Sequence, residues 1–420
     1  MKKVLILTVT AGNGHNACAN AMRQVLLDKG AEVKVVDLLK SYSTKLNVWV
    51  ADGGYSLAVS RLPHLYDYFY NKYMKADPEK RYSCPSQNTV ASTLDGLLRD
   101  ILDFKPDVIY CTHFYGSIAL TDLKLMLDLP CKCIAANLDY VNSPFWEAGI
   151  GVDYFAIPNE DFINEFIAEG YQYERLLPLG LPVNARTLDM VDKAEARRQL
   201  GLDADVFTVL VMFGGGLWSG GFKIFKELLR ALKDKNAQII AINGKDKKGF
   251  KKIDRLLRSK KARGNAHGGA LGGALGGVKI LNVGFTDNVP LYLSAVDLAI
   301  CKCGGTGATE IINKGVPMLV TEHVPAQEKH NIVYLKKKGV LLSFKNSKQL
   351  KKHIADLCEN PERLNEMSKN TLALKKPAIL DLAEVILSQP TADYDEFAEQ
   401  CKTLDISKKA VKKALKLAGK

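Results

Sequence analysis

Short apolar runs alternate with segments of helical spacing along most of the chain. Near the start, Val4–Val9 predicts a buried strand, Ala11–His15 a glycine turn and Ala17–Asp28 a helix. Glu32–Leu38 predicts a second strand, and the same order continues with apolar runs at 108–111, 133–136 and 154–157. Because strands separated by helices form parallel sheets covered on both faces, this part of the chain predicts an α/β domain.

The same pattern starts again after residue 200. Phe207–Phe213 predicts a strand, 214–221 a glycine loop and Phe222–Leu232 a helix. Further apolar runs follow at 238–242, 278–283, 298–301 and 318–320. Two segments interrupt the order: residues 47–75, which are rich in aromatic residues but lack a regular period, and residues 264–277, a glycine-rich stretch that we expect to be a flexible loop.

The two series together predict the α/β class, with two Rossmann-like doubly wound domains that face a cleft. We place the first domain at 1–185, the second at 186–385 and a helical, basic tail at 386–420, with a hinge at Leu181–Asn184. In doubly wound domains, ligands bind at the carboxyl ends of the strands, so candidate chemistry is sought there.

The positive charge of the chain is concentrated in two stretches. The net charge is +12, from 58 Lys and Arg against 46 Asp and Glu. Residues 245–263 hold ten basic and two acidic side chains (+8), and residues 402–420 hold seven lysines and one aspartate (+6). The rest of the chain is therefore close to neutral. Two local basic patches favour binding to an anionic surface, whereas charge spread over the whole chain would indicate a generally basic protein.

The apolar positions within these stretches differ. Phe250, Ile253 and Leu257 have the spacing of a helix that covers a sheet, so we expect the first stretch to be the solvated face of that helix. In the second stretch, Ile406, Val411 and Leu415 fall near one face with lysines elsewhere, a pattern typical of an interfacial helix on anionic lipid.

No run approaches the roughly 18 apolar residues that a membrane-spanning helix needs. The apolar start leads into a glycine turn, so we do not expect it to be a signal peptide. We expect the nine cysteines to be reduced thiols, and the two Cys-x-Cys pairs, Cys131 with Cys133 and Cys301 with Cys303, to pack within strands and bind no metal.

The first glycine turn could bind an anion. Gly12, Gly14 and His15 follow a strand and open a helix, where unpaired N–H groups and the helix dipole favour negative charge. His15 could take a proton from a bound hydroxyl. The same turn also fits a dinucleotide fingerprint with Asp37 as ribose partner, and it fits plain packing of strand on helix.

The second half carries a similar turn with further polar groups. Gly304, Gly305, Thr306 and Gly307 follow a strand and open a helix, where backbone N–H groups can approach phosphate, and Glu310 lies one turn on, within reach of a ribose diol. An amide beside a carboxylate suits the vicinal hydroxyls of a sugar. The residues of this second group are Gln327, Glu328 and Asn331.

In this order and spacing, the motifs resemble one glycosyltransferase family. It contains the monogalactosyldiacylglycerol synthases, the processive diacylglycerol glucosyltransferases and, more distantly, the lipid II N-acetylglucosaminyltransferase. The segments that carry the resemblance are 284–290, 295–298, 304–310, 315–317 and 325–328 in the second half, and the first glycine turn, Asp139, Phe145-Trp146, 152–155 and 180–183 in the first half.

The resemblance implies a GT-B glycosyltransferase that inverts the anomeric centre of a UDP-sugar and needs no metal or other cofactor. Domain 1–185 would take the lipid acceptor and domain 186–385 the donor. The implied acceptor-side residues are His15 as catalytic base, together with Gly12, Gly14 and Trp146. Asp139 either orients this base or caps a helix. The implied donor-binding residues are Gly214, Gly215, Gly216, Gly304, Gly305, Thr306, Gly307, Glu310, Gln327, Glu328 and Asn331.

Two departures from the family pattern concern the acceptor side. Asn13 interrupts the three glycines that usually precede the histidine, and Ser143-Pro144 stands where a histidine commonly precedes the tryptophan. The other histidines, at 64, 113, 323 and 330, are expected to be ordinary surface or core residues.

The expected activity is hexose transfer from a UDP-sugar to diacylglycerol or a related glycolipid. The expected partners are these substrates and anionic lipids, not nucleic acid, because neither basic stretch has interleaved aromatic residues. We expect a cytoplasmic protein attached peripherally to the cytoplasmic membrane face. The alternatives are a non-catalytic protein of the same fold that binds UDP-sugar or lipid, and a dinucleotide-dependent enzyme.

Overall fold

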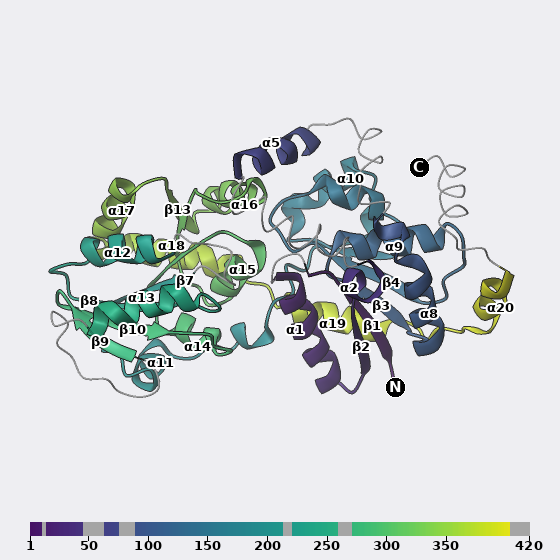
Figure 1. Ribbon diagram of the computed structural model, residues 1–420, viewed down its shortest axis with the longest axis horizontal. Helices are drawn as coiled ribbons and strands as arrows, with labels where there is room; N and C mark the ends of the chain where they lie inside the picture. The colour runs from purple at the N-terminus through teal and green to yellow at the C-terminus, as the bar shows by residue number, and fades with distance from the viewer. Residues whose placement is uncertain (11–13, 45–62, 75–88, 213–220, 259–270, 404–420) are drawn as a thin grey trace. The chain divides into compact units, whose positions relative to one another are not determined.

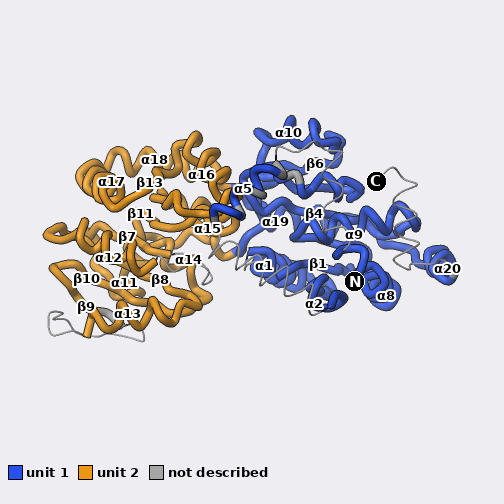
Figure 2. The backbone as a smooth tube through the Cα atoms, turned by 45° about the horizontal axis from the view of Figure 1, so that its top comes forward, with its two compact units in different colours: residues 1–185, 376–420 blue, residues 186–375 orange. Residues whose placement is uncertain are grey.

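The computed structural model describes residues 1–10, 14–44, 63–74, 89–212, 221–258 and 271–403. The chain forms two compact units, one of residues 1–185 and 376–420 and the other of residues 186–375 (Figure 2). Each unit is an α/β domain built on its own sheet, as the alternation of strands and helices predicts (Figure 1).

The first unit is built on a parallel sheet of six strands in the order β2-β1-β3-β4-β5-β6. The central strands are mostly apolar and buried because both faces of the sheet are covered. The strands are β1 (Lys3–Thr8), β2 (Glu32–Asp37), β3 (Val108–Cys111), β4 (Lys132–Ala136), β5 (Tyr154–Ala156) and β6 (Leu176–Leu177). The helices are α1 (Gly14–Asp28), α2 (Leu38–Tyr42), α5 (Pro63–Met74), α8 (Leu94–Phe104), α9 (Phe114–Lys124), α10 (Ile163–Ala168), α19 (Ala378–Ser388) and α20 (Asp395–Thr403), with 3₁₀ turns at Pro144–Gly149, Glu160–Phe162 and Tyr173–Arg175.

The second unit has a sheet of seven strands in the order β13-β12-β11-β7-β8-β10-β9. The strands are β7 (Phe207–Met212), β8 (Ala237–Ile242), β9 (Leu271–Leu275), β10 (Val278–Val283), β11 (Leu298–Cys301), β12 (Met318–Thr321) and β13 (Leu341–Phe344). The helices are α11 (Lys193–Gln199), α12 (Gly221–Ala231), α13 (Lys247–Arg258), α14 (Val289–Ser294), α15 (Gly305–Asn313), α16 (Ala326–Lys337), α17 (Ser347–Glu359) and α18 (Pro361–Ala373), and a 3₁₀ turn lies at Ala185–Thr187. α13 buries Ile253 and Leu257 and contacts β9 and β10, which confirms, for the described residues up to Arg258, that the basic stretch is the outer face of a sheet-covering helix.

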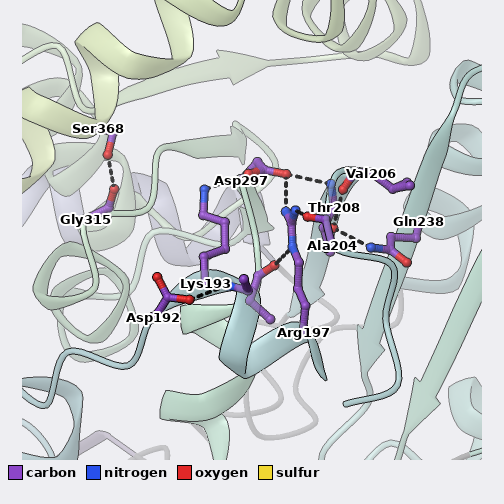
Figure 3. Close-up of polar contacts among 12 residues, drawn as sticks. Asp192, Lys193, Arg197, Ala204, Val206, Thr208, Gln238, Asp297, Gly315 and Ser368 are labelled. Atoms are coloured by element: carbon purple, nitrogen blue, oxygen red, sulfur yellow. Dashed lines mark hydrogen bonds and ion pairs between the residues drawn. The ribbon is translucent and has the colours of Figure 1, made fainter. Parts of the chain in front are cut away.

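The amino end of this second sheet is closed by a buried polar network (Figure 3). Arg197 is 4% exposed and donates to Asp297 Oδ2 at 2.7 Å and to the carbonyl of Ala295 at 2.9 Å. The same Asp297 oxygen accepts the N–H of Thr208, the second residue of β7, at 2.8 Å. The Ala295–Leu298 segment of the family resemblance is therefore explained by these contacts, which lie at the opposite end of the strands from the candidate site.

Three expectations differ from the structure. Residues 271–275 of the supposed loop form β9, which pairs antiparallel with β10; Gly273 fits there because a Cβ would lie 3.3 Å from Leu257 of α13. Residues 264–270 lie outside the described part of the chain. Within the irregular segment 47–75, residues 63–74 form α5.

The third difference concerns the end of the second domain, which we expected at 385. The chain instead returns to the first unit at Lys376 (Figure 2). Helix α19 buries Ile379, Leu382 and Ile386 and contacts α1. Its apolar face therefore belongs to the core of the first unit, which the sequence spacing alone does not reveal.

Candidate functional site

The strand orders locate one switch point in each sheet, where ligands bind in doubly wound folds. In the first unit, β1 lies between β2 and β3, so the crossover directions diverge between β1 and β3. His15 follows β1 and His113 follows β3. In the second unit the divergence lies between β7 and β11, and the turn Gly304–Gly307 follows β11.

A network of hydroxyl and amide side chains supports the turn after β1. Asn16 in the first turn of α1 receives a hydrogen bond from Thr8 Oγ1 and donates one to Thr10 Oγ1, each at 2.9 Å. Asp37 Oδ2 accepts from the N–H and the hydroxyl of Thr10, and Asp37 Oδ1 accepts from Lys40 N–H to cap α2. Asp37 thus holds Thr10 through Oδ2 and caps α2 through Oδ1, which accounts for both oxygens without a ribose. Gly14 begins α1, whereas Gly12 lies outside the described residues.

The imidazole of His15 is oriented by the main chain. His15 Nδ1 lies 2.5 Å from the carbonyl oxygen of Thr112, at the end of β3. Because a carbonyl only accepts, Nδ1 carries the proton and Nε2 keeps a lone pair. Burial lowers the pKa of His15 below its usual 6.5, with the Thr112 bond opposing that shift. His15 is therefore a neutral imidazole at pH 7 with Nε2 able to accept a proton.

His113 lies against His15, a contact that the sequence reading missed. The ring centroids are 4.6 Å apart in an edge-on arrangement. His113 Nδ1 accepts the N–H of Tyr115 and so caps α9. Burial and the neighbouring His15 hold the pKa of His113 well below 6.5. The sequence signal that could have indicated this contact is the position of His113 directly after β3, the strand that pairs with β1.

Aromatic rings extend from His113 in a row. His113 stacks on Phe114 at 4.2 Å, and Phe114 stacks on Phe145 at 5.2 Å between centroids. Tyr70 of α5 approaches Phe145 at 6.0 Å. Phe114 and Phe145 are both partly exposed, so this row presents apolar surface beside the two histidines.

Trp146 lies in the core of the first unit and is not part of that row's exposed surface. It is 4% exposed and packs against Phe155 with 4.8 Å between ring centroids. Its carbonyl accepts a hydrogen bond from Tyr171 at 3.1 Å. The structure therefore assigns Trp146 a packing contact, and Phe145 is the ring of this pair that stacks on Phe114.

The Nδ1 atom of His15, where we expected Asp139 to orient the base, is instead bonded to the main chain. The one hydrogen on His15 Nδ1 is directed to Thr112. The N–H of Asp139 donates to Asn137 Oδ1 at 3.1 Å. Its charge acts on Tyr70, whose phenol pKa is raised first by burial and then by Asp139.

In the second unit, the predicted phosphate turn begins helix α15. Gly304 is the N-cap, and the first N–H bonded within the helix is that of Ala308, which donates to the Gly304 carbonyl at 2.9 Å. Gly305, Thr306 and Gly307 thus form the first turn, where N–H groups and the helix dipole favour an anion. A Cβ at Gly307 would meet no atom of the described residues within 4 Å. The other predicted glycines, Gly214–Gly216, lie outside the described residues.

Glu310 lies in the same helix, one turn after Thr306. Burial raises the pKa of its carboxyl to about 7. A carboxyl in this state carries its charge only part of the time at pH 7, and a hydroxyl donor would stabilise the ionised form.

Helix α16 brings the remaining predicted residues to the same end of the sheet. Glu328 Oε1 lies 2.8 Å from Nζ of Lys302, a residue of the loop after β11. Asn331 is fully buried and donates to the carbonyl of Cys303 at 2.9 Å. Gln327 immediately precedes Glu328 in the first turn of the helix. The structure thus brings the sugar-binding and phosphate-binding candidates of the second unit together.

The described ranges hold neither a metal-binding cluster nor a helix that could span a membrane. No group of three or more His, Cys, Asp or Glu side chains there could hold a metal ion. Both Cys-x-Cys pairs are buried. None of the helices in those ranges is both long and apolar enough to span a bilayer.

Comparison with known proteins covers most of the chain. Residues 15–183 match the family model of monogalactosyldiacylglycerol synthase, and residues 209–383 match that of the glycosyltransferase family 28 C-terminal domain. A processive diacylglycerol beta-glucosyltransferase of Staphylococcus saprophyticus is 24% identical over 90% of both chains. Monogalactosyldiacylglycerol synthase 3 of Arabidopsis thaliana is 25% identical over 92% of this chain and 81% of its own.

Solved structures share the fold at lower identity. MurG of Acinetobacter baumannii superposes with a TM-score of 0.58 at 16% identity, over 92% of this chain and 99% of its own. Anabaena HepE in complex with UDP gives a TM-score of 0.51 at 15% identity, over 93% and 100%.

The fold, the glycine turn Gly304–Gly307 after β11 and the match of residues 209–383 to a glycosyltransferase domain define a glycosyltransferase of the GT-B class. The two family matches together place the chain in the family of the monogalactosyldiacylglycerol synthases and processive diacylglycerol glucosyltransferases.

Proposed function

We propose that this protein transfers a hexose from a UDP-sugar to diacylglycerol or a related glycolipid, with inversion at the anomeric carbon. The observation that carries the proposal is His15, a neutral imidazole fixed by Thr112 at the switch point of the unit that matches monogalactosyldiacylglycerol synthase. The names of the curated relatives support the choice of acceptor.

In the proposed reaction His15 acts as general base. Its Nε2 takes the proton of the acceptor hydroxyl while the hydroxyl oxygen bonds to the anomeric carbon. The bond from that carbon to the diphosphate oxygen breaks, and UDP leaves with the electron pair on the opposite face. His113 acts as a positioning residue that holds the His15 ring edge-on, and Phe114 and Phe145 offer apolar surface to the lipid.

The donor would be held by α15 and α16. Gly305, Thr306 and Gly307 would bind the diphosphate at the helix N-terminus, where the dipole stabilises the charge that develops on the leaving group. Glu310 would accept hydrogen bonds from the ribose hydroxyls. Gln327 and Glu328 would bind the hexose hydroxyls. We retain Gly214–Gly216 as a second contact of the diphosphate.

The proposed transfer needs no metal, because the helix N-terminus supplies the electrostatic stabilisation. EDTA-treated enzyme should therefore keep its rate. A loss of transfer that Mg²⁺ or Mn²⁺ restores would contradict this part of the proposal.

The proposed acceptor lies in a bilayer, so the enzyme must work at a membrane surface. We propose peripheral attachment to the cytoplasmic face, through the lysine-rich residues 402–420 and anionic lipids. Vesicle flotation at low and high salt tests this, with the full chain and a variant ending at 401. We expect binding that salt weakens and truncation reduces; salt-insensitive binding that survives truncation would contradict it.

The experiment that tests the proposed function is transfer of labelled hexose to diacylglycerol in mixed anionic vesicles. UDP-glucose, UDP-galactose and UDP-N-acetylglucosamine are offered separately, and the product is identified by mass spectrometry. We expect a β-linked glycosyl-diacylglycerol from one of them. Binding of UDP-sugar without transfer would favour a sensor of the same fold, and binding of NAD in place of UDP would favour a dinucleotide enzyme.

A further inference from the structure

Lys302 links the phosphate turn to the helix that carries the sugar-binding candidates. It follows β11 and lies two residues before Gly304, and its Nζ contacts Glu328 Oε1 at 2.8 Å. The hydrogen bond from Asn331 to the Cys303 carbonyl runs beside this ion pair. The loop after β11 is therefore tied to the start of α16 by two contacts.

The two carboxylate oxygens of Glu328 differ in their surroundings. Oε1 accepts from Lys302, whereas Oε2 is buried and has no hydrogen-bond partner among the residues that the structure describes. The side chain is 12% exposed. A buried carboxylate oxygen without a donor costs free energy, which a ligand hydroxyl would recover.

The negative charge of Glu328 explains why a lysine beside it would favour binding of a diphosphate. The position of a Cβ on Gly304 would lie 3.6 Å from Glu328 Oε1, so the carboxylate is adjacent to the turn proposed to take a diphosphate. An unpaired carboxylate there would repel the diphosphate. The ammonium group of Lys302 pairs with Oε1 and offsets that charge. Oε2 is then left to accept a hydrogen bond from a neutral donor such as a hydroxyl.

We infer that Lys302 is a positioning residue of the donor site, which sets Glu328 Oε2 for a hexose hydroxyl beside the diphosphate. The inference rests on the proposed function and adds to it a residue that determines specificity for UDP-hexose over UDP. Lys302 acts through Glu328, and its ammonium is not required to touch the hexose.

Calorimetric titration of the full chain with UDP and with UDP-glucose or UDP-galactose, whichever the wild type binds more tightly, tests this. Lys302→Met removes the charge and keeps most of the side-chain length. We expect the affinity advantage of UDP-hexose over UDP to fall about tenfold, which corresponds to about 1.4 kcal/mol. Lys302→Arg, the matched control, should keep most of that advantage.

A double-mutant cycle with Glu328→Gln separates this role from others. If Lys302 acts through Glu328, Lys302→Met should cause little further loss of the hexose advantage in the Glu328→Gln background. An unchanged advantage in Lys302→Met, equal weakening of UDP and UDP-hexose, or a full further loss in the double variant would each overturn the inference. If Lys302→Met does not fold, Lys302→Gln, which keeps an N–H donor without the charge, replaces it. Failure of the wild type to bind any UDP-hexose would overturn the proposed function as well, whereas binding with an unchanged advantage overturns the role of Lys302 alone.

Discussion

The ring of His15 lies edge-on against the ring of His113, with 4.6 Å between their centroids. The Nδ1 atoms of both rings are engaged by the main chain: His15 donates to the carbonyl of Thr112, and His113 accepts from the N–H of Tyr115. Burial lowers the pKa of both. The pair is therefore neutral at pH 7 and fixed at the ends of two neighbouring strands.

Replacing His113 should separate its two contacts. His113→Asn keeps a side-chain oxygen for the cap of α9 but loses the ring beside His15, so stability should stay near the wild type while the transfer rate falls about tenfold. His113→Ala loses both and should also lower the free energy of unfolding by about 1 kcal/mol. Urea titration and initial rates measure the two effects. A His113→Asn enzyme with full transfer activity would contradict the positioning role.

The transfer rate should depend on pH through His15. Because its pKa lies below 6.5, the base form dominates at neutral pH, and kcat/KM should be level near pH 7 and decline only as the pH falls below 6.5. A profile whose acidic limb is centred at or above pH 7 would show that another group, or an exposed histidine, acts as base.

The free energy of unfolding should depend on pH through the same two histidines. The unfolded chain takes up protons on them below pH 6.5 while the folded chain resists, so the free energy of unfolding falls as pH drops through this range. Other groups titrate there too, so urea titrations of wild type and His113→Asn at pH 7.5 and 5.5 are compared. The variant should lose less stability between the two pH values, and an identical loss would contradict the assignment.

Glu310 should make nucleotide binding dependent on pH. Its raised pKa of about 7 means that ribose hydroxyls, which need an ionised acceptor, bind with release of a proton, so the Kd of UDP should rise as pH falls from 8 to 6, by up to about tenfold per unit. Glu310→Gln should weaken UDP and UDP-hexose by the same factor and remove that dependence. The same slope in Glu310→Gln would assign the titration to another group.

Gly180 should be required for the return of the chain to the first unit. It has φ +101°, and a Cβ there would lie 3.1 Å from the Cβ atoms of Ala378 and Lys376. Gly180→Ala should lower the free energy of unfolding by roughly 1–3 kcal/mol through strain and contact together. Gly30→Ala is the matched control and should cost about 1 kcal/mol or less, since Gly30 has φ +83° and no atom of the described part of the chain lies within 4 Å of its Cβ position. Equal costs would show that the contact with residues 376–378 contributes nothing.

The sequence predicts the architecture because the alternation of apolar runs and helical spacing is strong in both halves. It also predicts the turn at Gly304–Gly307 and the group on α16, because these follow directly from strand ends. It does not predict β9, since glycines carry no side-chain pattern, nor the return at Lys376, since an amphipathic helix does not specify which sheet it covers.

The contacts of the acceptor side could not be predicted from the sequence to the same extent. His113 meets His15 only because β3 pairs with β1, so its partner is nearly a hundred residues away in the chain. Trp146 and Phe145 are adjacent in sequence, yet one is buried and the other partly exposed, which is decided by the 3₁₀ turn that holds them. Asp139 follows a strand as a catalytic carboxylate would, but a backbone carbonyl takes the Nδ1 hydrogen of His15.

The most direct test of the central claim is the rate at which His15→Ala transfers hexose from its UDP-sugar to diacylglycerol in vesicles, with UDP-hexose affinity measured on the same preparation. Because the proposed donor residues lie in the other unit, affinity should stay near that of the wild type. Loss of the base should lower the rate by roughly 10²–10⁴-fold. A variant that binds UDP-hexose normally and transfers at nearly the wild-type rate would contradict the role assigned to His15.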